Sequence, residues 1–198
     1  MNILYVIDNI LYVNITNKCP CNCTFCIRRE GDSVGHSGSL WLEKEPSLSE
    51  IINEFKKEDL SKYSEVVFCG YGEPLMRLYD VIEVCKYIRS VSNIKIRINT
   101  NGLADLIHEK STAPLLKGIV DSISISLNAP SKEEYNEITR PIFGLESFES
   151  LLNFAKESKE NIEEVQFSVV DVISEEQIKR CEHISKEMGI PLRVRKKS

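Results

Sequence analysis

The sequence predicts an α/β fold, a partial (βα)6 TIM-like barrel with an N-terminal β-hairpin. The first observation behind this prediction is that β-rich segments alternate with helical ones, which is typical of a parallel sheet built from βαβ units. The second is that one side of several strands is small and polar. The strand candidates of the barrel span 11–17, 65–69, 93–99, 119–127, 164–171 and 191–195.

The polar side distinguishes this sheet from the common parallel architectures. In one strand Ser122, Ser124 and Ser126 alternate with Ile123 and Ile125. A parallel sheet covered on both faces has nearly continuous apolar strands, and a closed eight-stranded barrel fills its interior with branched aliphatic side chains. We therefore expect a curved, open barrel with helices outside and a ligand in its polar interior. A polar sheet face exposed at an edge is the alternative.

Short local signals mark the ends of the elements. The motif ILYV occurs at 3–6 and again at 10–13, joined through Asp8 and Asn9, two residue types that tolerate the positive φ of tight turns, so residues 1–13 are expected to form a hairpin. Gly189, followed by Pro191, is typical of a helix C-terminus. Capping-box spacing predicts helix starts at Ser47 with Glu50, Ser131 with Glu134, Ser174 with Gln177 and, more weakly, Asp80 with Glu83.

Composition and charge narrow the class of protein. The 198 residues are 42% hydrophobic and 28% charged, with a net charge of −5, as expected for one soluble domain spanning 1–198. The charge argues against nucleic acid or a membrane surface as partner, and no run approaches the roughly 18 apolar residues of a membrane helix. The start lacks the basic region and cleavage site of a signal peptide. We expect a cytoplasmic protein, in which seven cysteines would not form a disulfide framework.

One irregular segment, residues 27–46, separates the first strand from the first helix. It contains three glycines and Trp41, the one tryptophan of the chain. A connection of this length inside a domain is usually functional or disordered. A substrate loop or lid and a mobile surface loop are both compatible with the sequence.

The motif CPCNCTFC at 19–26 concentrates four of the seven cysteines. In the spacing Cys19-x3-Cys23-x2-Cys26, three thiolates on one loop suit three irons of a 4Fe-4S cube and leave the fourth iron open. Cys21, between two of these positions, is expected to point away. A zinc site is the alternative, but it needs four ligands, normally as two pairs, and the sequence has no second CxxC. Cys85 and Cys181 lie among apolar helix positions and are expected to be buried.

A second motif, FCGYGEPLM at 68–76, follows the strand candidate 65–69. Glycines at a strand end let a ligand approach the backbone closely, and the carboxylate of Glu73 could accept hydrogen bonds from an ammonium group. Gly-Pro turns are common, so this motif is weak evidence by itself.

Together the two motifs resemble those of the radical S-adenosylmethionine (radical SAM) superfamily. Phe25 supplies the aromatic residue that this family usually has before its last cysteine, whereas Tyr71 replaces the first glycine of the usual Gly-Gly-Glu-Pro. The resemblance implies a 4Fe-4S cluster on Cys19, Cys23 and Cys26, with S-adenosylmethionine on its open iron and the ammonium of that cofactor at Glu73.

The resemblance also implies further contacts with S-adenosylmethionine, although polar barrel filling or helix capping would explain each of these residues equally well. The implied contacts lie at strand ends and in neighbouring loops: Phe25, Tyr71, Gly72, Asn99, Asn101, Ser124, Ser126, Asn128, Arg140, Val170 and Asp171. Among them, Arg140 would hold the carboxylate, and Phe25, Val170 and Asp171 would lie near the adenine. No catalytic residue beyond these ligands is assigned.

Within the superfamily, the chain looks like the TatD-associated radical SAM proteins. The features behind this resemblance are the short chain, the motifs LYVNITNKC and CTFCIR, and the GYGEP variant of the second motif. The resemblance implies reductive cleavage of S-adenosylmethionine to a 5′-deoxyadenosyl radical that abstracts hydrogen from an unknown substrate. It also implies an external flavodoxin- or ferredoxin-like electron donor, a possible functional link to a TatD-type hydrolase, and no auxiliary cluster. A glycyl-radical enzyme activase is one alternative. An iron–sulfur or zinc module for electron transfer or docking is the non-enzyme alternative.

Overall fold

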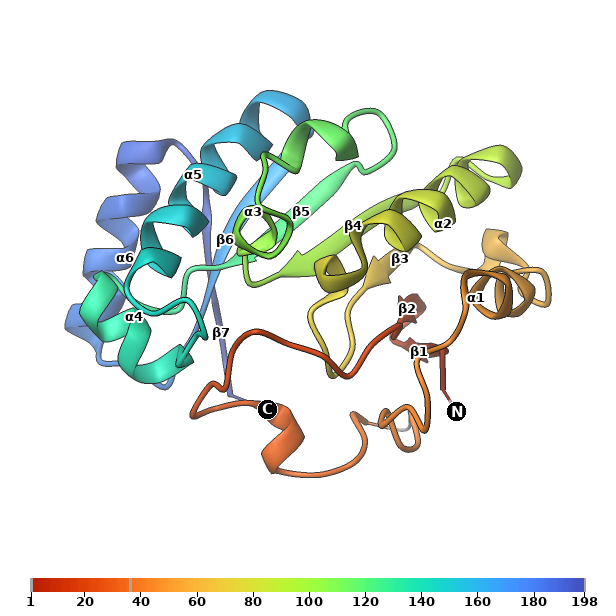
Figure 1. The fold of residues 1–198 in the computed structure, drawn as a ribbon, viewed down its shortest axis with the longest axis horizontal. Helices are drawn as coiled ribbons and strands as arrows, with labels where there is room; N and C mark the ends of the chain where they lie inside the picture. Colours follow the sequence, from red (N-terminus) through yellow and green to blue (C-terminus); the bar gives the residue numbers. More distant parts are fainter. Residues whose placement is uncertain (1, 36, 198) are drawn as a thin grey trace.

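A computed structural model describes residues 2–35 and 37–197, and it contains one seven-stranded sheet whose strands lie in chain order (Figure 1). The first two strands pair antiparallel, and each later strand pairs parallel with the one before it. Within the described residues the last strand does not pair with the first, so the barrel is open. This confirms the predicted fold class. The strands are β1 (Leu4–Ile7), β2 (Ile10–Val13), β3 (Glu65–Phe68), β4 (Lys95–Thr100), β5 (Ser122–Ser126), β6 (Glu164–Val170) and β7 (Leu192–Arg195).

The N-terminal hairpin forms as predicted. Asp8 and Asn9 have φ angles of 48° and 66°, which make the two-residue turn between β1 and β2. The strand expected over 11–17 is shorter, because the ladder with β3 ends at Val13. The residues after Val13 leave the sheet and use their side chains to hold a distant loop.

The helices cover one face of the sheet (Figure 1). Four short 3-10 segments connect elements: η1 (Ile27–Arg29), η2 (Leu60–Lys62), η3 (Pro74–Arg77) and η4 (Ala113–Leu116). The α-helices are α1 (Leu48–Phe55), α2 (Leu78–Val91), α3 (Ala104–His108), α4 (Lys132–Thr139), α5 (Glu146–Asn161) and α6 (Glu175–Met188).

Most of the predicted helix ends are confirmed. Ser47 and Ser174 form complete capping boxes, and the Ser131 hydroxyl accepts from the N–H of Glu134. Gly189 ends α6 with a φ of 60°. The start predicted at Asp80 is wrong because α2 begins two residues earlier.

Asp80 instead lies in the first turn of α2, where its carboxylate pairs with Arg77 at 2.7 Å. A carboxylate in this position also interacts favourably with the positive end of the helix dipole. The short helix η3 runs directly into α2, so no capping side chain is needed where α2 begins.

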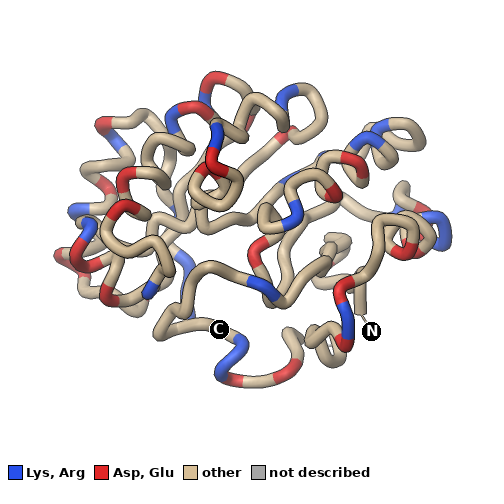
Figure 2. The backbone as a smooth tube through the Cα atoms, in the orientation of Figure 1, with Lys and Arg blue, Asp and Glu red and all other residues tan. Residues whose placement is uncertain are grey.

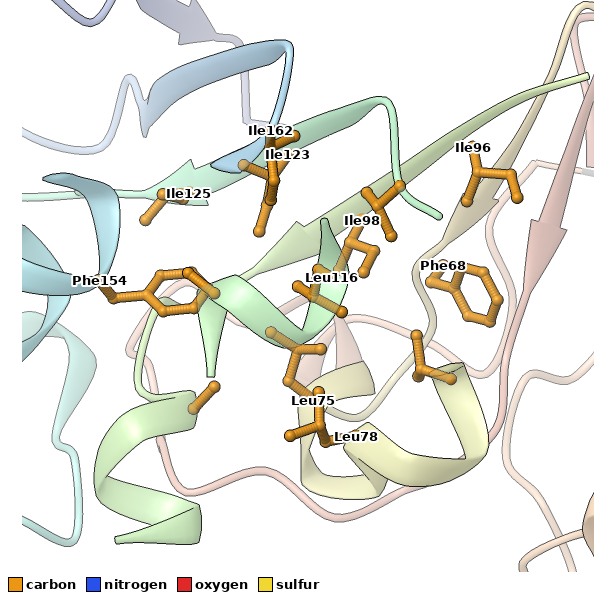
Figure 3. Packing of buried hydrophobic residues seen from close by; sticks show 14 of the residues in the cluster. Phe68, Leu75, Leu78, Ile96, Ile98, Leu116, Ile123, Ile125, Phe154 and Ile162 are labelled. Carbon is orange, nitrogen blue, oxygen red and sulfur yellow. The ribbon is translucent and has the colours of Figure 1, made fainter. Parts of the chain in front are cut away.

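The apolar core lies between the helices and the sheet (Figure 3). Ile96 and Ile98 of β4, Ile123 and Ile125 of β5, and Phe154 of α5 are all fully buried there. Alternation along each strand places these side chains on the helix-covered face. Full burial of one such side chain stabilises the fold by about 1.5–3 kcal/mol.

The other side of the sheet, which we call the inner face, is polar. Parallel register puts paired residues on the same face, and the pairs Asn99–Ser124 and Ser124–Gln166 run across three strands. Arg97 also lies on this face, with Nη2 and Nε 2.8 and 3.2 Å from the carboxylate oxygens of Glu65. The predicted polar interior is therefore present.

Residues 27–46, here called the bridging segment, are tied to the start of the chain by asparagine side chains. The Asn14 amide donates to Leu40 O at 2.7 Å, and the Asn17 amide donates to Leu42 O at 2.8 Å while accepting from the N–H of Leu42. Leu40 is fully buried against Tyr5 and Tyr71. Residue 36 lies outside the described residues; of the rest, Leu40 and Leu42 are buried and fix the later part of the segment, whereas most residues of 27–35 are exposed.

The loop after β3 packs directly on the segment after β2. A Cβ atom at Gly72 would lie 2.3 Å from the carbonyl oxygen of Thr16, and one at Gly70 would lie 2.1 Å from Oδ1 of Asn14. On the side where a Cβ atom would project, the chain's own backbone and an asparagine fill the space, so these two positions require glycine for packing; ligand access to their backbone stays a prediction. Among the described residues no helix is both long and apolar enough to cross a membrane.

We predict that Gly72→Ala lowers the free energy of unfolding by about 2–3 kcal/mol, because the added methyl overlaps a backbone carbonyl that cannot rotate away. Urea unfolding followed by circular dichroism measures the change. Gly31→Ala is the matched control, since no atom lies within 4 Å of its Cβ position, and its effect should stay within about 0.5 kcal/mol. Equal unfolding midpoints for the two variants would contradict the packing argument.

Candidate functional site

The cysteine loop lies at the carboxyl end of β2, between two other loops. On one side it is bound to the end of α4, where Asn22 N–H donates to Thr139 O at 3.0 Å and Thr24 N–H donates to Ile138 O at 2.8 Å. On the other side Glu73 N–H donates to Lys18 O at 2.9 Å. These backbone bonds fix the loop that carries the thiols.

Three of the four thiols come together in this loop. The Cys21 thiol is hydrogen-bonded to both Cys19 and Cys23 and is buried between them. The expectation that Cys21 points away is therefore wrong in this structure. Cys21 makes an isolated β-bridge with Pro141, and in extended chain alternate side chains share one side, so positions 19, 21 and 23 face the same way.

The hydrogen bonds among the thiols shift their pKa values in opposite directions. The pKa of Cys19 is lowered to about 6, chiefly by the hydrogen bond with Cys21 and also by Arg28 and the Asn101 amide, while burial opposes the shift. The same contact lowers the pKa of Cys23, while the pKa of Cys21 is raised because its proton is shared with both neighbours. Thiolate is the form that binds metals, so Cys19 and Cys23 are the thiols best prepared to act as ligands.

Cys26 is placed differently from the other three. Its Sγ accepts a hydrogen bond from Arg28 Nε at 3.3 Å, and Arg28 in turn lies over the Trp41 ring, 6.0 Å from its centroid. Within the described residues no group of three His, Cys, Asp or Glu side chains is arranged around a single metal position.

Glu73 is buried and receives three hydrogen bonds. Leu75 N–H and the Thr100 hydroxyl donate to Oε1 at 3.0 and 2.7 Å, and Asn101 N–H donates to Oε2 at 2.7 Å. A carboxylate oxygen offers two lone pairs, so Oε2 keeps acceptor capacity. Burial raises the pKa of Glu73 to about 7, and the nearby Cys19 adds to the rise, while the three donors oppose it.

Asn101 joins the two motifs. Its backbone binds Glu73, and its side-chain amide lies 3.9 Å from Cys19 Sγ and 3.7 Å from Cys21 Sγ. From the sequence, Thr100 is identified only as part of the polar strand end Asn99-Thr100-Asn101, which the family resemblance places near the cofactor. That pattern does not show that the Thr100 hydroxyl donates to Glu73.

Two further asparagines on the expected list carry buried acceptors without partners. The Oδ1 atoms of Asn99 and Asn128 make no hydrogen bond, and Asn128 takes a left-handed φ of 57°. A buried acceptor without a donor costs about 1–3 kcal/mol, so these atoms suit the amino and hydroxyl groups of a bound polar ligand. Ser124 is buried on the inner face, and Ser126 is half-buried on it.

Other predicted residues are placed around the site in different ways. Arg140 has an exposed side chain that folds back on α4, with Nε 3.4 Å from Glu137 O, while its backbone carbonyl accepts from Asn22. The Asp171 carboxylate accepts from Lys197 N–H at 2.6 Å. Val170 is buried, and Phe25 is half-buried.

Tyr71 supports the bridging segment. Its hydroxyl donates to Gly31 O at 2.7 Å, and its ring meets Trp41 edge to face with centroids 5.0 Å apart. The side chain at this position therefore has a packing role.

The comparisons with known proteins identify the family. The model of the Radical SAM superfamily matches residues 13–185, so this chain belongs to that superfamily. A GTP 3′,8-cyclase of Lactiplantibacillus plantarum is 32% identical over 129 residues, which are 65% of this chain and 36% of that protein. A probable dual-specificity RNA methyltransferase RlmN of Thermotoga maritima is 28% identical over 143 residues, 70% of this chain and 38% of that protein.

Among solved structures, SuiB of Streptococcus suis bound to the precursor peptide SuiA superposes with a TM-score of 0.71 at 19% identity, covering 100% of this chain and 41% of that one. This similarity shows a shared fold. The chain spans less than half the length of these relatives.

The family uses a 4Fe-4S cluster and S-adenosylmethionine, and another SuiB structure contains the latter. The residues here fit both groups. Thiols of lowered pKa lie at a strand end, Glu73 keeps acceptor capacity for an ammonium, and two amide oxygens await donors.

We predict a pH-dependent contribution of Glu73 to the stability of the reduced, metal-free protein. Its pKa is raised from 4.5 to about 7 on folding, so the native state binds more protons between these values. The stabilisation is fully present below about pH 4.5 and is lost as the pH rises through 7. Relative to wild type, Glu73→Gln should therefore gain about 2.5 kcal/mol in free energy of unfolding between pH 5 and pH 8.

Urea unfolding at the two pH values measures this difference, in which the titrations common to both proteins cancel. Glu43→Gln, an exposed glutamate of the bridging segment, controls for the loss of one carboxylate. If the gap between Glu73→Gln and wild type were the same at both pH values, the carboxyl group would not be perturbed as described.

Proposed function

We propose that this chain is a radical SAM enzyme whose 4Fe-4S cluster is held by Cys19, Cys23 and Cys26. When bound, the cluster and S-adenosylmethionine would supply reductive cleavage to a 5′-deoxyadenosyl radical, which abstracts hydrogen from a substrate. The observation that carries the proposal is Asn101, which contacts the cysteine loop with its side chain and Glu73 with its backbone. These contacts bring two motifs about fifty residues apart next to each other, which supports a single site.

The chain's own residues would bind and orient the cofactor. Oε2 of Glu73 would accept from the ammonium group, and the free acceptors of Asn99 and Asn128 would take hydrogen bonds from ribose hydroxyls or the adenine amino group. We propose roles as further contacts for the remaining predicted residues Phe25, Tyr71, Gly72, Asn101, Ser124, Ser126, Arg140, Val170 and Asp171. For Gly72 this contact is through the backbone.

An external flavodoxin- or ferredoxin-like protein is the proposed electron donor, in a cytoplasmic setting that would keep the thiols reduced. A hollow of about 560 Å³ borders the outer side of the cysteine loop, lined by Lys18, Cys19, Arg28 and Ile142 among others. Lys18 and Arg28 outnumber Glu109 among its charged lining residues, which suits an acidic redox protein, and its position beside Cys19 leaves a short path for the electron to the proposed cluster.

We place the chain with the TatD-associated radical SAM proteins, with a possible link to a TatD-type hydrolase, on the GYGEP and CTFCIR motifs. The substrate is not identified. Neither the activase alternative nor the electron-transfer module is favoured by a specific contact. The module in particular would leave the free acceptors of Asn99 and Asn128 without a purpose.

We predict that the protein, reconstituted without oxygen with iron and sulfide, forms 5′-deoxyadenosine from S-adenosylmethionine when a strong reductant is added. Liquid chromatography with mass spectrometry measures the product. Omission of the reductant is the control. A preparation that holds about four irons per chain and still forms no 5′-deoxyadenosine would contradict the proposed activity.

We predict that Cys21→Ala keeps about four irons per chain, whereas Cys23→Ala loses the cluster. The contact of Cys21 with both neighbours makes this comparison decisive, because all three thiols lie close enough to compete for iron. Iron content and the visible absorbance of the reconstituted variants measure the outcome. Loss of the cluster in Cys21→Ala with retention in Cys23→Ala would reverse the ligand assignment.

A further inference from the structure

We propose that Arg193 and Arg195 of β7 form a binding site for an oxyanion group, a phosphate or carboxylate, of the substrate. The inference rests on the proposed function in that the anion is assigned to the substrate of the same barrel. It adds the chemical class of that substrate, which must be anionic.

The register of the sheet places both arginines on the inner face. Arg193 pairs with Ser168, which pairs with Ser126, and Arg195 pairs with Val170. Paired residues of parallel strands point to the same side, so these arginines share the face of the buried serines. They lie at the carboxyl end of β7, and the cysteine loop follows the carboxyl end of β2, at the same edge of the sheet.

The two arginines have no acidic partner within the described residues. Arg77 pairs with Asp80, Arg180 with Glu134, and Arg97, on the same inner face, with both oxygens of Glu65. No carboxylate lies within ion-pair distance of Arg193 or Arg195 in the described ranges. This is notable in a chain with 30 acidic and 25 basic residues.

The positive charges on this face are close enough to disfavour one another. Both arginines are exposed to solvent on this face, and the pKa of Arg195 is lowered by partial desolvation and by the charges of Arg193 and Arg97. An oxyanion between Arg193 and Arg195 would remove this repulsion. Two adjacent guanidinium groups also match the planar geometry of carboxylate and phosphate, to which each can donate two parallel hydrogen bonds.

The acidic residues near the end of β7 are engaged with Lys197: Glu30 pairs with its Nζ, and the Asp171 carboxylate accepts from its backbone N–H. Acidic and basic positions are interspersed along the outer helices α4, α5 and α6, whereas the chain end that continues from β7 is basic (Figure 2). Basic residues on an edge strand also oppose pairing with another sheet. Protection of the edge requires a positive charge near β7 but not on the inner face of the sheet. Substitutions of Arg195 and of the neighbouring Lys196 therefore distinguish edge protection from anion binding.

The test measures binding of two probes, pyrophosphate and citrate, to the reconstituted full chain by isothermal titration calorimetry in about 0.15 M salt, where exposed charges are largely screened. Arg195→Gln should weaken binding of the preferred probe about tenfold or more, and Arg195→Lys should restore part of it. Lys196→Gln is the matched control, since it removes one charge from the next residue, which is exposed as Arg195 is but lies beyond β7, and it should change binding less than twofold. The preferred probe identifies the oxyanion.

Three results would overturn the proposal. In the first, Arg195→Gln and Lys196→Gln weaken probe binding equally, and in the second the wild-type protein binds neither probe at millimolar concentration. In the third, Arg195→Gln loses affinity for S-adenosylmethionine while its probe binding is unchanged. The last result would assign the arginine to the cofactor. Failure of 5′-deoxyadenosine formation is a separate readout, so loss of the proposed activity and loss of the anion site are distinguished.

Discussion

The structure of the site depends on the backbone contact between the segment after β2 and the turn after β3. Glu73 N–H donates to Lys18 O at 2.9 Å, and Gly72 lies flat against the carbonyl of Thr16. Parallel neighbours deliver their carboxyl ends side by side, so the two loops must share a narrow space. Because Cys19 directly follows Lys18, one contact sets the start of the cysteine loop and the position of the Glu73 carboxylate at once.

That closeness has an electrostatic consequence. Cys19 carries a lowered pKa and Glu73 a raised one, with burial as the main cause for Glu73 and the charge of Cys19 contributing. Two negative groups in one buried region are unfavourable unless cations or donors join them. Thr100 and Asn101 offset part of this cost. An iron–sulfur cluster on the thiols and an ammonium on the carboxylate would compensate both groups together.

The sequence was sufficient for features that follow from local pattern. Alternation along the strands predicted the polar inner face, and the cap signals at Ser47 and Ser174 located helix starts. Features set by contacts across the sheet were not predictable. The glycine at 72 is required by a backbone from another strand, and the amide of Asn14 holds a loop 26 residues away. The side of the chain on which Cys21 falls depended on a bridge with Pro141.

The C-terminal residues are another case in which pairing across the sheet determines a placement that the sequence alone does not show. In sequence, Arg193 and Arg195 belong to a basic C-terminal tail, and both are exposed in the structure, but the register with β6 places them on the inner face of the sheet. The ion pair of Lys197 with Glu30, at 2.6 Å, joins the end of this strand to the bridging segment, but such exposed pairs contribute at most about 1 kcal/mol. Charge there is therefore not needed to hold the fold together. Two exposed cations without acidic partners on the inner face of the open barrel concentrate positive potential there, and such a field attracts anions despite a negative net charge.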